Sequence, residues 1–306
     1  MVEDFQSGVF VSTHRYKYLV NKLKRVSKRA LWVLTEHLKV GEFEPLRHEL
    51  FFGEDSNSEV PPIIIELPNG EEIKIEGIID RVDILNDGEK SYLKVIDYKS
   101  GNREFSLSDA YYGLQIQLIV YMDAVLSNTD KLVKNEAYPA GAFYFKIDDP
   151  IVNTDEDDAK AIEEKIHGEL KMNGLVLNDI KVIKALDNEL SKALDEEDDK
   201  SKKSNVIPVT LKKDGSPNSH STVYDEKDFK NIMIHVRGLI KDIATEILRG
   251  KIKIEPCKNG KQTPCEYCDF HSICQFDASF DDNGYRVLKK IKDEEILEKI
   301  DQENKE

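Results

Sequence analysis

Long hydrophobic runs are missing from this sequence, and no apolar segment approaches the roughly 20 residues that a membrane-spanning helix needs. The first residues also lack the apolar core of a secretory signal peptide. We therefore expect a soluble, cytoplasmic protein with no membrane partner. At 306 residues and 40% hydrophobic content, the chain can bury a substantial core, and we expect one globular unit with appendages.

Cysteine is also scarce, because the chain has four cysteines and all of them lie between Cys257 and Cys274. Such a cluster is too local for a disulfide framework that staples a whole fold. Grouped cysteines in a reducing compartment are more typical of a metal site. The cluster is therefore a candidate metal centre.

Acidic residues outnumber basic ones, and the net charge of −15 is unfavourable for contact with nucleic acid. The charge is unevenly distributed, however, because the segment from Arg15 to Arg29 contains no acid. Apolar residues at helical spacing between Tyr16 and Leu38 predict one long amphipathic helix with basic side chains around its remaining face. Taken alone, that face indicates a solvated surface, but the net charge does not exclude DNA or RNA.

Strand-like runs dominate the next part of the chain. The turn signals "PNG" and "NDG" divide three strands in a predicted antiparallel meander, at Ile63 to Leu67, Ile73 to Leu85 and Tyr92 to Tyr98. A helix capped by Ser106 or Ser108 is predicted to run through Leu126, and "AGAFYFKI" then reads as another strand. A helix between two strands permits a parallel crossover, so we expect an α/β fold with a central mixed β-sheet flanked by helices.

Four regions follow from this reading. Residues 1–50 form the basic helix region, 51–150 the core with the chemistry, 151–225 a charged helical insertion with a flexible loop, and 226–306 the C-terminal part. Within the insertion, Asn153 to Ser204 is predicted to form a helical hairpin followed by a loop at "DEEDDKSKKS". The last region is predicted to begin with a helix from Glu226 to Leu248 and to end with the cysteine cluster and a tail.

Two carboxylates and a lysine interrupt the apolar strands. In a strand, residues two apart share a face, so Asp97 and Lys99 point the same way at the end of one strand. The connection through "NDG" can bring Asp80 of the preceding strand beside Asp97. Hard oxygen ligands of this kind suit Mg²⁺ or Mn²⁺, and a neighbouring ammonium can stabilise charge on a phosphate. The group indicates phosphodiester hydrolysis, although each residue alone is better explained as an exposed strand-end charge.

The motifs "GIIDRVD", "VIDYKSG" and "GLQIQLIVY" resemble the successive motifs of the RecB-type branch of the PD-(D/E)XK nuclease superfamily, which has a restriction-endonuclease-like core. The resemblance implies that Asp80 and Asp97 bind metal and that Lys99 is the catalytic lysine. It also implies that Gln117 and Tyr121 form the family's Q-x-x-x-Y motif, which positions the DNA strand. Two further acids are weaker candidates: Glu49 is left open, and Glu76 is interpreted as an ordinary strand or loop acid.

The cysteine spacing is Cys265-x2-Cys268-x5-Cys274. From spacing alone, these thiolates with Cys257 or His271 could bind zinc. The run resembles the C-terminal part of the 4Fe-4S clasp in the nuclease domain of the AddB family, and a related clasp occurs in Cas4-type nucleases. No cysteine precedes Cys257, so the cluster is either completed by Cys257, incomplete, or replaced by zinc.

The family's motif histidine is not assigned to any of the available histidines, His14, His37 and His48. The resemblance therefore predicts a C-terminal fragment of a longer subunit. As a function, it implies a Mg²⁺-dependent DNA exonuclease domain of a bacterial AddAB-type helicase-nuclease, paired with an AddA-like helicase in double-strand break resection and recombinational repair. The alternatives are a Cas4-like exonuclease and a catalytically inactive DNA-binding or scaffolding module. The isolated chain is expected to cleave DNA weakly, if at all.

Overall fold

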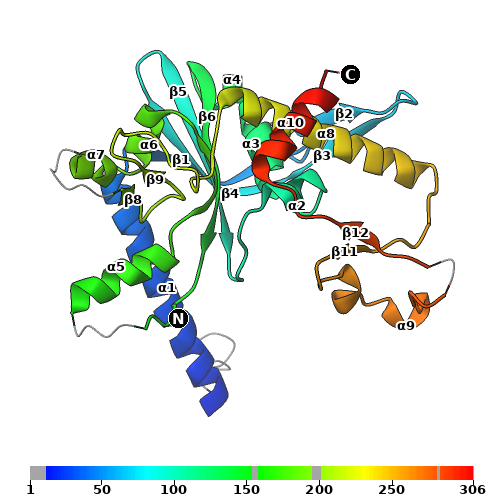
Figure 1. Cartoon of the computed structure of the whole chain (residues 1–306), viewed down its shortest axis with the longest axis horizontal. Helices are drawn as coiled ribbons and strands as arrows, with labels where there is room; N and C mark the ends of the chain where they lie inside the picture. Colours follow the sequence, from blue (N-terminus) through cyan, green and yellow to red (C-terminus); the bar gives the residue numbers. More distant parts are fainter. Residues whose placement is uncertain (1–11, 154–157, 195–200, 281–282, 306) are drawn as a thin grey trace.

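The computed structural model describes residues 12–153, 158–194, 201–280 and 283–305. Its centre is a six-stranded sheet with the order β1-β4-β5-β6-β7-β10 (Figure 1). Neighbouring strands pair antiparallel at β1–β4, β4–β5 and β6–β7, and parallel at β5–β6 and β7–β10. The predicted α/β fold with a mixed sheet is therefore confirmed. The strands of this sheet are β1 (Glu44–Phe52), β4 (Gly77–Asn86), β5 (Lys90–Lys99), β6 (Glu136–Lys146), β7 (Asn173–Leu177) and β10 (Val223–Tyr224).

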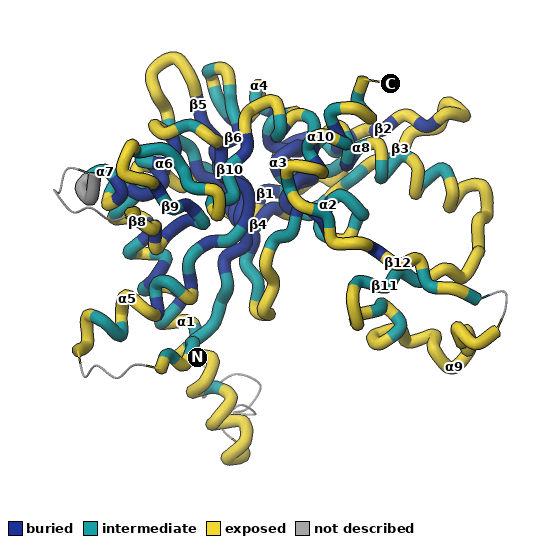
Figure 2. The backbone as a smooth tube through the Cα atoms, viewed as in Figure 1, coloured by how far each residue is buried: buried dark blue, intermediate teal, exposed yellow. Residues whose placement is uncertain are grey.

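Helices cover both faces of the sheet. On one face, α3 (Gln117–Leu126) packs against β5 and β6, and α8 (Glu226–Leu248) packs against α3. On the other face lies α1 (His14–Val40), whose His37 meets the ring of Phe145 edge-on at 5.9 Å. Figure 2 shows that burial is concentrated in the sheet and the helix segments directly against it. Both long helices lie where they were predicted. α1 extends two residues beyond the predicted helix at each end, and α8 has the predicted bounds.

The predicted three-strand meander is wrong in one respect. β2 (Ile63–Glu66) and β3 (Glu72–Ile75) form a separate two-stranded hairpin, and β1 takes the place beside β4 in the main sheet. The predicted strand from Ile73 to Leu85 is broken at Glu76, whose carboxylate accepts a hydrogen bond from the backbone N–H of Glu54. At the next residue, a Cβ on Gly77 would lie 2.9 Å from the ring of Phe52, so the close packing there requires glycine.

The helix predicted from Ser106 to Leu126 is also divided. Ser106 is the N-cap of α2 (Leu107–Tyr111), and its side chain accepts a hydrogen bond from the N–H of Asp109. Gly113 then adopts a positive φ of 83°, which ends the first helix before α3 begins. The short helix α4 (Thr129–Leu132) follows, and the chain returns through β6 parallel to β5. The predicted parallel crossover is therefore confirmed.

The charged region contains more strand than predicted. α5 (Ala159–Glu169), α6 (Ile180–Leu186) and α7 (Glu189–Leu194) are helices, but β7 lies between them and joins the main sheet. The short run from Gly174 to Leu177 is buried although its sequence neighbours are charged. Because the surrounding sequence is charged, the whole region was interpreted as helical and this strand was not predicted. Part of the predicted flexible loop, residues 195–200, lies outside the described residues; β8 (Lys202–Lys203) and β9 (Thr210–Leu211) form a small hairpin after it.

The C-terminal part forms a small module beside the main sheet. It comprises β11 (Cys257–Asn259), a 3-10 helix (Pro264–Tyr267), α9 (His271–Cys274) and β12 (Arg286–Leu288), and it is largely exposed in Figure 2. α10 (Asp293–Glu303) then packs against α8. No helix in the described part of the chain is long and apolar enough to cross a membrane.

Candidate active site

The two predicted metal-binding carboxylates lie opposite each other at one end of the sheet. The antiparallel register of β4 and β5 pairs Arg81 with Ile96, so the next pair outward is Asp80 and Asp97. Side chains of directly opposed residues share a face of the sheet. Asp80 is anchored because its Oδ2 accepts a hydrogen bond of 2.7 Å from the backbone N–H of Tyr98. Its Oδ1 takes part in no hydrogen bond with the described residues.

Asp97 is the buried member of this pair. Its side chain is 3% exposed, and its Oδ2 lies 2.6 Å from Nζ of Lys99, which is 24% exposed. The contact is an ion pair without the angular alignment of a hydrogen bond, and Oδ2 has no hydrogen-bond partner among the described residues. Burial raises the pKa of Asp97; Lys99 opposes this shift and the negative charge of Asp80 adds to it.

Lys99 is held in place by the helix that crosses over the site. Its Nζ donates a 2.9 Å hydrogen bond to Oε1 of Gln117, and Nε2 of Gln117 donates a 2.8 Å bond to the hydroxyl of Tyr121. Gln117 is the first residue of α3, so Gln117 and Tyr121 lie one turn apart on the same helix face. Burial raises the pKa of Tyr121, and the charges of Asp97 and Asp80 contribute in the same direction. The five predicted site residues therefore form one connected group.

Tyr144 is a further member of the site that the sequence did not reveal. It lies directly beside Asp97 on β6, and Nζ of Lys99 lies 5.5 Å from the centre of its ring. Its hydroxyl is buried and has no hydrogen-bond partner among the described residues, and burial raises its pKa to about 12. In the sequence, "AGAFYFKI" is typical of a strand in the apolar core. Finding Tyr144 requires the β5–β6 register, which the sequence does not give.

Comparison with known proteins decides the family. Residues 1–275 match the family model described as the PD-(D/E)XK nuclease superfamily. The chain belongs to this superfamily. It is 52% identical over 304 residues to an ATP-dependent helicase/deoxyribonuclease subunit of Alkaliphilus oremlandii, covering 99% of this chain and 26% of that protein. The protein of the same name from Clostridium kluyveri is 41% identical over 300 residues, covering 97% of this chain and 25% of that protein. The chain thus spans about a quarter of the length of these relatives.

The motif "DRVD" on β4 also places charged residues on the opposite face of the sheet. Arg81 forms two hydrogen bonds with Asp83, of 2.6 and 2.9 Å, and Nζ of Lys94 lies 2.9 Å from the same carboxylate. All three are buried, with Asp83 fully so. Burial lowers the pKa of Lys94, and Asp83 opposes that shift. This ion cluster lies under α1, on the opposite face from Asp80, Asp97 and Lys99.

The remaining candidates lie outside the connected group. Glu49 is exposed on β1 with a positive φ of 50°, and its neighbours His48 and Leu50 pair with Arg81 and Ile79, which places it across from Asp80. No three side chains of His, Cys, Asp or Glu in the described residues converge as metal ligands, so Glu49 does not complete a third position there. Glu76 instead accepts a hydrogen bond from the backbone N–H of Glu54, which agrees with its interpretation as an ordinary strand or loop acid.

The cysteines share one module but are not assembled into a centre. Cys257 and Cys265 are partly buried, whereas Cys268 and Cys274 are exposed, and none is disulfide-bonded. The thiols do not form a three-ligand group in the described structure, so the structure does not show a fit to a metal cluster. His271, the alternative ligand by spacing, is exposed at the start of α9.

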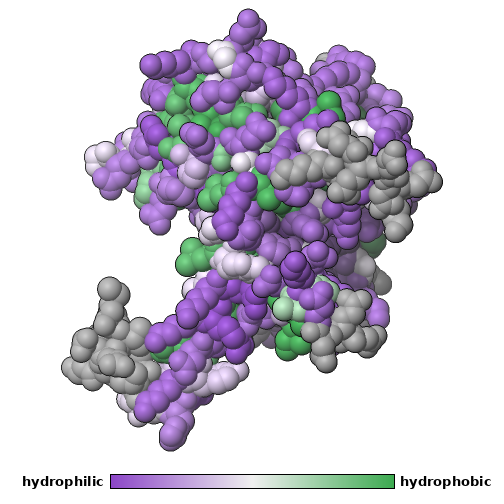
Figure 3. Space-filling model, turned by 90° about the vertical axis from the view of Figure 1, so that its left-hand side faces the viewer, coloured by the Kyte–Doolittle hydropathy of each residue, from purple (hydrophilic) through white to green (hydrophobic). Residues whose placement is uncertain are grey.

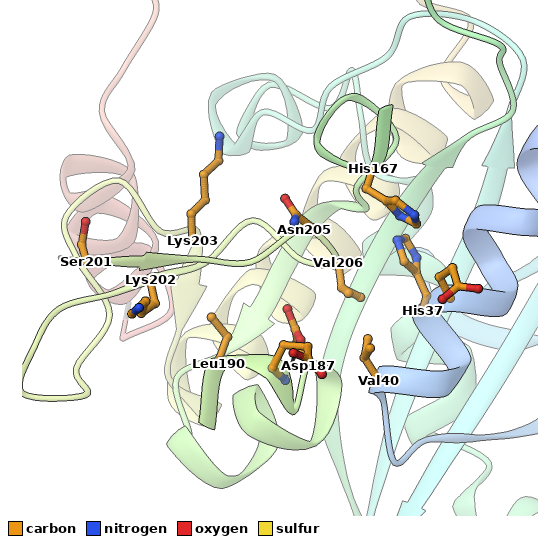
Figure 4. A pocket seen from close by; sticks show the side chains of 12 residues that line it. His37, Val40, His167, Asp187, Leu190, Ser201, Lys202, Lys203, Asn205 and Val206 are labelled. Carbon is orange, nitrogen blue, oxygen red and sulfur yellow. Dashed lines mark hydrogen bonds between the residues drawn. The ribbon is translucent and has the colours of Figure 1, made fainter. Parts of the chain in front are cut away.

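A cavity of about 380 Å³ lies on the α1 side of the sheet (Figure 4). His37 and His167 turn their rings towards each other at its edge, with centroids 6.4 Å apart. Both ring nitrogens of His37 are buried without hydrogen-bond partners in the described residues. None of the predicted site residues lines the cavity. His37 contacts Phe145, which points away from Tyr144 and Asp97, so His37 does not belong to the connected group around Asp97.

Proposed function

We propose that this chain is the Mg²⁺-dependent DNA nuclease domain of a bacterial AddAB-type helicase-nuclease and that it acts as an exonuclease. The observation that carries the proposal is the group formed by Asp80, Asp97 and Lys99 at the ends of β4 and β5. The group is supported from α3 by Gln117 and Tyr121. Membership of a nuclease superfamily and whole-chain similarity to helicase/deoxyribonuclease subunits support the same conclusion.

The carboxylates suit a divalent cation. Oδ1 of Asp80 takes part in no hydrogen bond with the described residues, and Oδ2 of the buried Asp97 contacts the Lys99 ammonium without accepting an aligned hydrogen bond. Mg²⁺ commonly binds through one or two carboxylates and fills its other positions with water and substrate phosphate, so a two-acid site is sufficient. Mn²⁺ suits the same donors. When bound, the ion would supply charge neutralisation at the phosphate and a more acidic water.

Each of the other residues has a role that follows from its contacts. Lys99 keeps an ammonium beside Asp97 because Gln117 fixes its position, and the ammonium can stabilise negative charge on the phosphate during hydrolysis. Tyr121 fixes the other end of the Gln117 amide and faces the strand ends from α3. Both α3 residues are partly exposed, so they can position the DNA backbone as well as the lysine.

The wider setting is part of the proposal. The relatives are subunits of ATP-dependent helicase/deoxyribonucleases, which supports an AddA-like helicase as partner and DNA as substrate. We also propose that the assembly resects double-strand breaks for recombinational repair. In that setting, the remainder of the full-length protein contributes to activity, and the isolated chain is expected to be slow.

A metal centre at Cys265, Cys268 and Cys274 is a separate proposal that rests on the thiol spacing. A 4Fe-4S cluster or zinc would tie the C-terminal module together, with Cys257 as the candidate fourth ligand. Metal analysis of protein purified without oxygen tests it. Stoichiometric iron or zinc that is lost in Cys268→Ser would support the centre, and metal-free protein would contradict it.

The test of the nuclease is cleavage of end-labelled single-stranded DNA with Mg²⁺ and with EDTA. The unaltered chain, Asp97→Ala and Lys99→Ala are compared after their folding has been checked by circular dichroism. Glu89→Gln is the matched control, because Glu89 is exposed in the turn at the far end of β4 and β5. We expect slow Mg²⁺-dependent cleavage that both site variants lose and the control keeps. Cleavage that survives in Asp97→Ala would refute the site, and DNA binding without any cleavage would favour the inactive binding module.

A further inference from the structure

α1 carries a concentration of positive charge that contrasts with the rest of the chain. From Ser12 to Thr35 the sequence has no acidic residue, although the whole chain has a net charge of −15. The first half of the helix is exposed (Figure 2) and presents a hydrophilic surface at the lower end of the molecule (Figure 3). Like charges on one helix destabilise it. A negatively charged ligand would compensate for this cost. The basic residues are Arg15, Lys17, Lys22, Lys24, Arg25, Lys28 and Arg29.

The basic residues fall into two rows. Arg15, Lys22 and Arg29 recur every seven residues, which is close to two helical turns, so they share one side of α1. Lys17, Lys24 and Lys28 share another side, about 140° around the helix at 100° per residue. We call the first set the inner row and the second set the outer row.

The inner row begins near the end of the sheet that carries the candidate site, although α1 and α3 cover opposite faces of that sheet. Arg29 of that row and the neighbouring Arg25 both bind the carboxylate of Asp149, just beyond the end of β6. Two residues earlier, the N–H of Ile147 donates a 2.8 Å hydrogen bond to the carbonyl of Lys99. In Figure 1, the N-terminal half of α1 continues past this end of the sheet. The inner row therefore begins beside the strand ends that carry Asp97 and Lys99, and it extends outward from them.

We propose that the inner row binds the phosphates of the DNA strand that occupies the nuclease site. The inference rests on the proposed function, because the site determines which strand is bound. From Arg15 to Arg29 the row is about 21 Å long at 1.5 Å per residue, comparable with about six phosphates at 3.4 Å along one strand. Arginine and lysine on a rigid helix give contacts to the backbone that do not depend on base sequence.

A protein partner is the competing occupant of this helix. Tyr16, Leu19 and Leu23 are exposed and form an apolar row of their own. A protein segment covering that row would leave Arg15 and Lys22 accessible. Charge complementarity favours DNA for the inner row. Arg29 is already paired with Asp149, but Arg15 and Lys22 form no ion pair within the described residues, and a run of phosphates supplies regularly spaced negative charge for them.

The test compares two matched double variants by anisotropy of a labelled single-stranded DNA in EDTA, so that no hydrolysis occurs. Arg15→Gln with Lys22→Gln removes two charges from the inner row; Lys17→Gln with Lys24→Gln removes two from the outer row at the same spacing. Each lost phosphate contact lowers the salt dependence of log K by about 0.7 for single strands. We expect the inner pair to lower the slope by about 1.4 and to weaken binding about 25-fold at 0.1 M salt. The outer pair should leave the slope unchanged and should weaken binding by no more than a few-fold.

Equal effects of the two pairs would overturn the proposal, because they would reflect net charge alone. Unchanged binding in the inner pair, or no binding by the unaltered chain at low salt, would also overturn it and would favour a protein occupant. The result is separable from the nuclease assay. If the inner pair behaves as expected but no chain cleaves DNA, the proposed DNA binding by the inner row stands and the proposed hydrolysis fails.

Discussion

Removing the buried carboxylate of Asp97 should separate its role in metal binding from its role in folding. Asp97 is 3% exposed, and burial raises its pKa above the ordinary value of 3.8. A carboxyl whose pKa is higher in the folded state than in the unfolded state costs stability as pH rises through that interval, and the cost remains at pH 7. In EDTA at pH 7, Asp97→Asn should therefore be at least as stable as the unaltered chain. Lys99 then loses a partner, but it is 24% exposed and keeps Gln117.

In Mg²⁺ the order of stability should reverse, so that the unaltered chain is more stable than Asp97→Asn. For a site with a Kd of about 1 mM, 10 mM Mg²⁺ stabilises the folded state by about 1.4 kcal/mol. At about 2.1 cal/mol/K of unfolding entropy per residue, this corresponds to a rise in Tm of about 2 °C for a chain of 306 residues. Asp97→Asn should lose this rise. Asp80 alone would then be a weak ligand.

Differential scanning calorimetry in EDTA and in Mg²⁺ measures both effects. Glu89→Gln is again the control, because it removes an exposed carboxylate from the other end of the same strands. An undiminished Mg²⁺ shift in Asp97→Asn would refute the assignment of this carboxylate as a metal ligand. A loss of the shift in both variants would show that Mg²⁺ acts through general charge screening.

Three further outcomes follow from other contacts. Lys99→Met should keep the Mg²⁺ shift in Tm but lower the cleavage rate by about 100-fold or more, since in the proposed mechanism the lysine stabilises charge on the phosphate and is not a metal ligand; a normal rate would remove Lys99 from the mechanism. Asp83→Asn should lower the free energy of unfolding in urea by about 3–5 kcal/mol, because it leaves Arg81 and Lys94 buried without their counter-charge. Burial and Lys94 lower the pKa of His37 from 6.5 to about 3, so stability is lost as pH falls through this range. His37→Leu should therefore reduce the slope of unfolding free energy against pH by about one proton between these values, measured by urea titrations.

The sequence could predict those features that depend on local spacing. Alternation placed Asp97 and Lys99 on one face of β5, and the i to i+4 spacing placed Gln117 and Tyr121 on one face of α3; both are observed. The length of α1 followed from a single periodic pattern that no glycine or proline interrupts. Local spacing was sufficient here because each inference needed only one element.

The sequence could not predict what depends on non-local contacts. The break at Glu76 accompanies the packing of Gly77 against Phe52 of another strand; a glycine within "IKIEGII" allows such close approach, but nothing in the segment identifies Phe52 as the contact. The place of β7 in the sheet depends on its pairing with β6, where a Cβ on Gly174 would lie 2.0 Å from the carbonyl oxygen of Ala142. Tyr144 was overlooked for the same reason, since its closeness to Asp97 exists only once β6 has paired with β5.

The motif "DRVD" on β4 places charged side chains on both faces of the sheet. Asp80 lies on the face that carries Asp97, whereas Arg81 and Asp83 lie on the opposite face, where Asp83 is paired directly with Lys94 of β5. A shift of one residue between β4 and β5 would bury charges without partners, which costs several kcal/mol. The same register places Asp80 opposite Asp97. The buried ion cluster thus fixes the alignment on which the carboxylate pair depends, so Asp83→Asn should impair cleavage as well as stability although it does not touch the site.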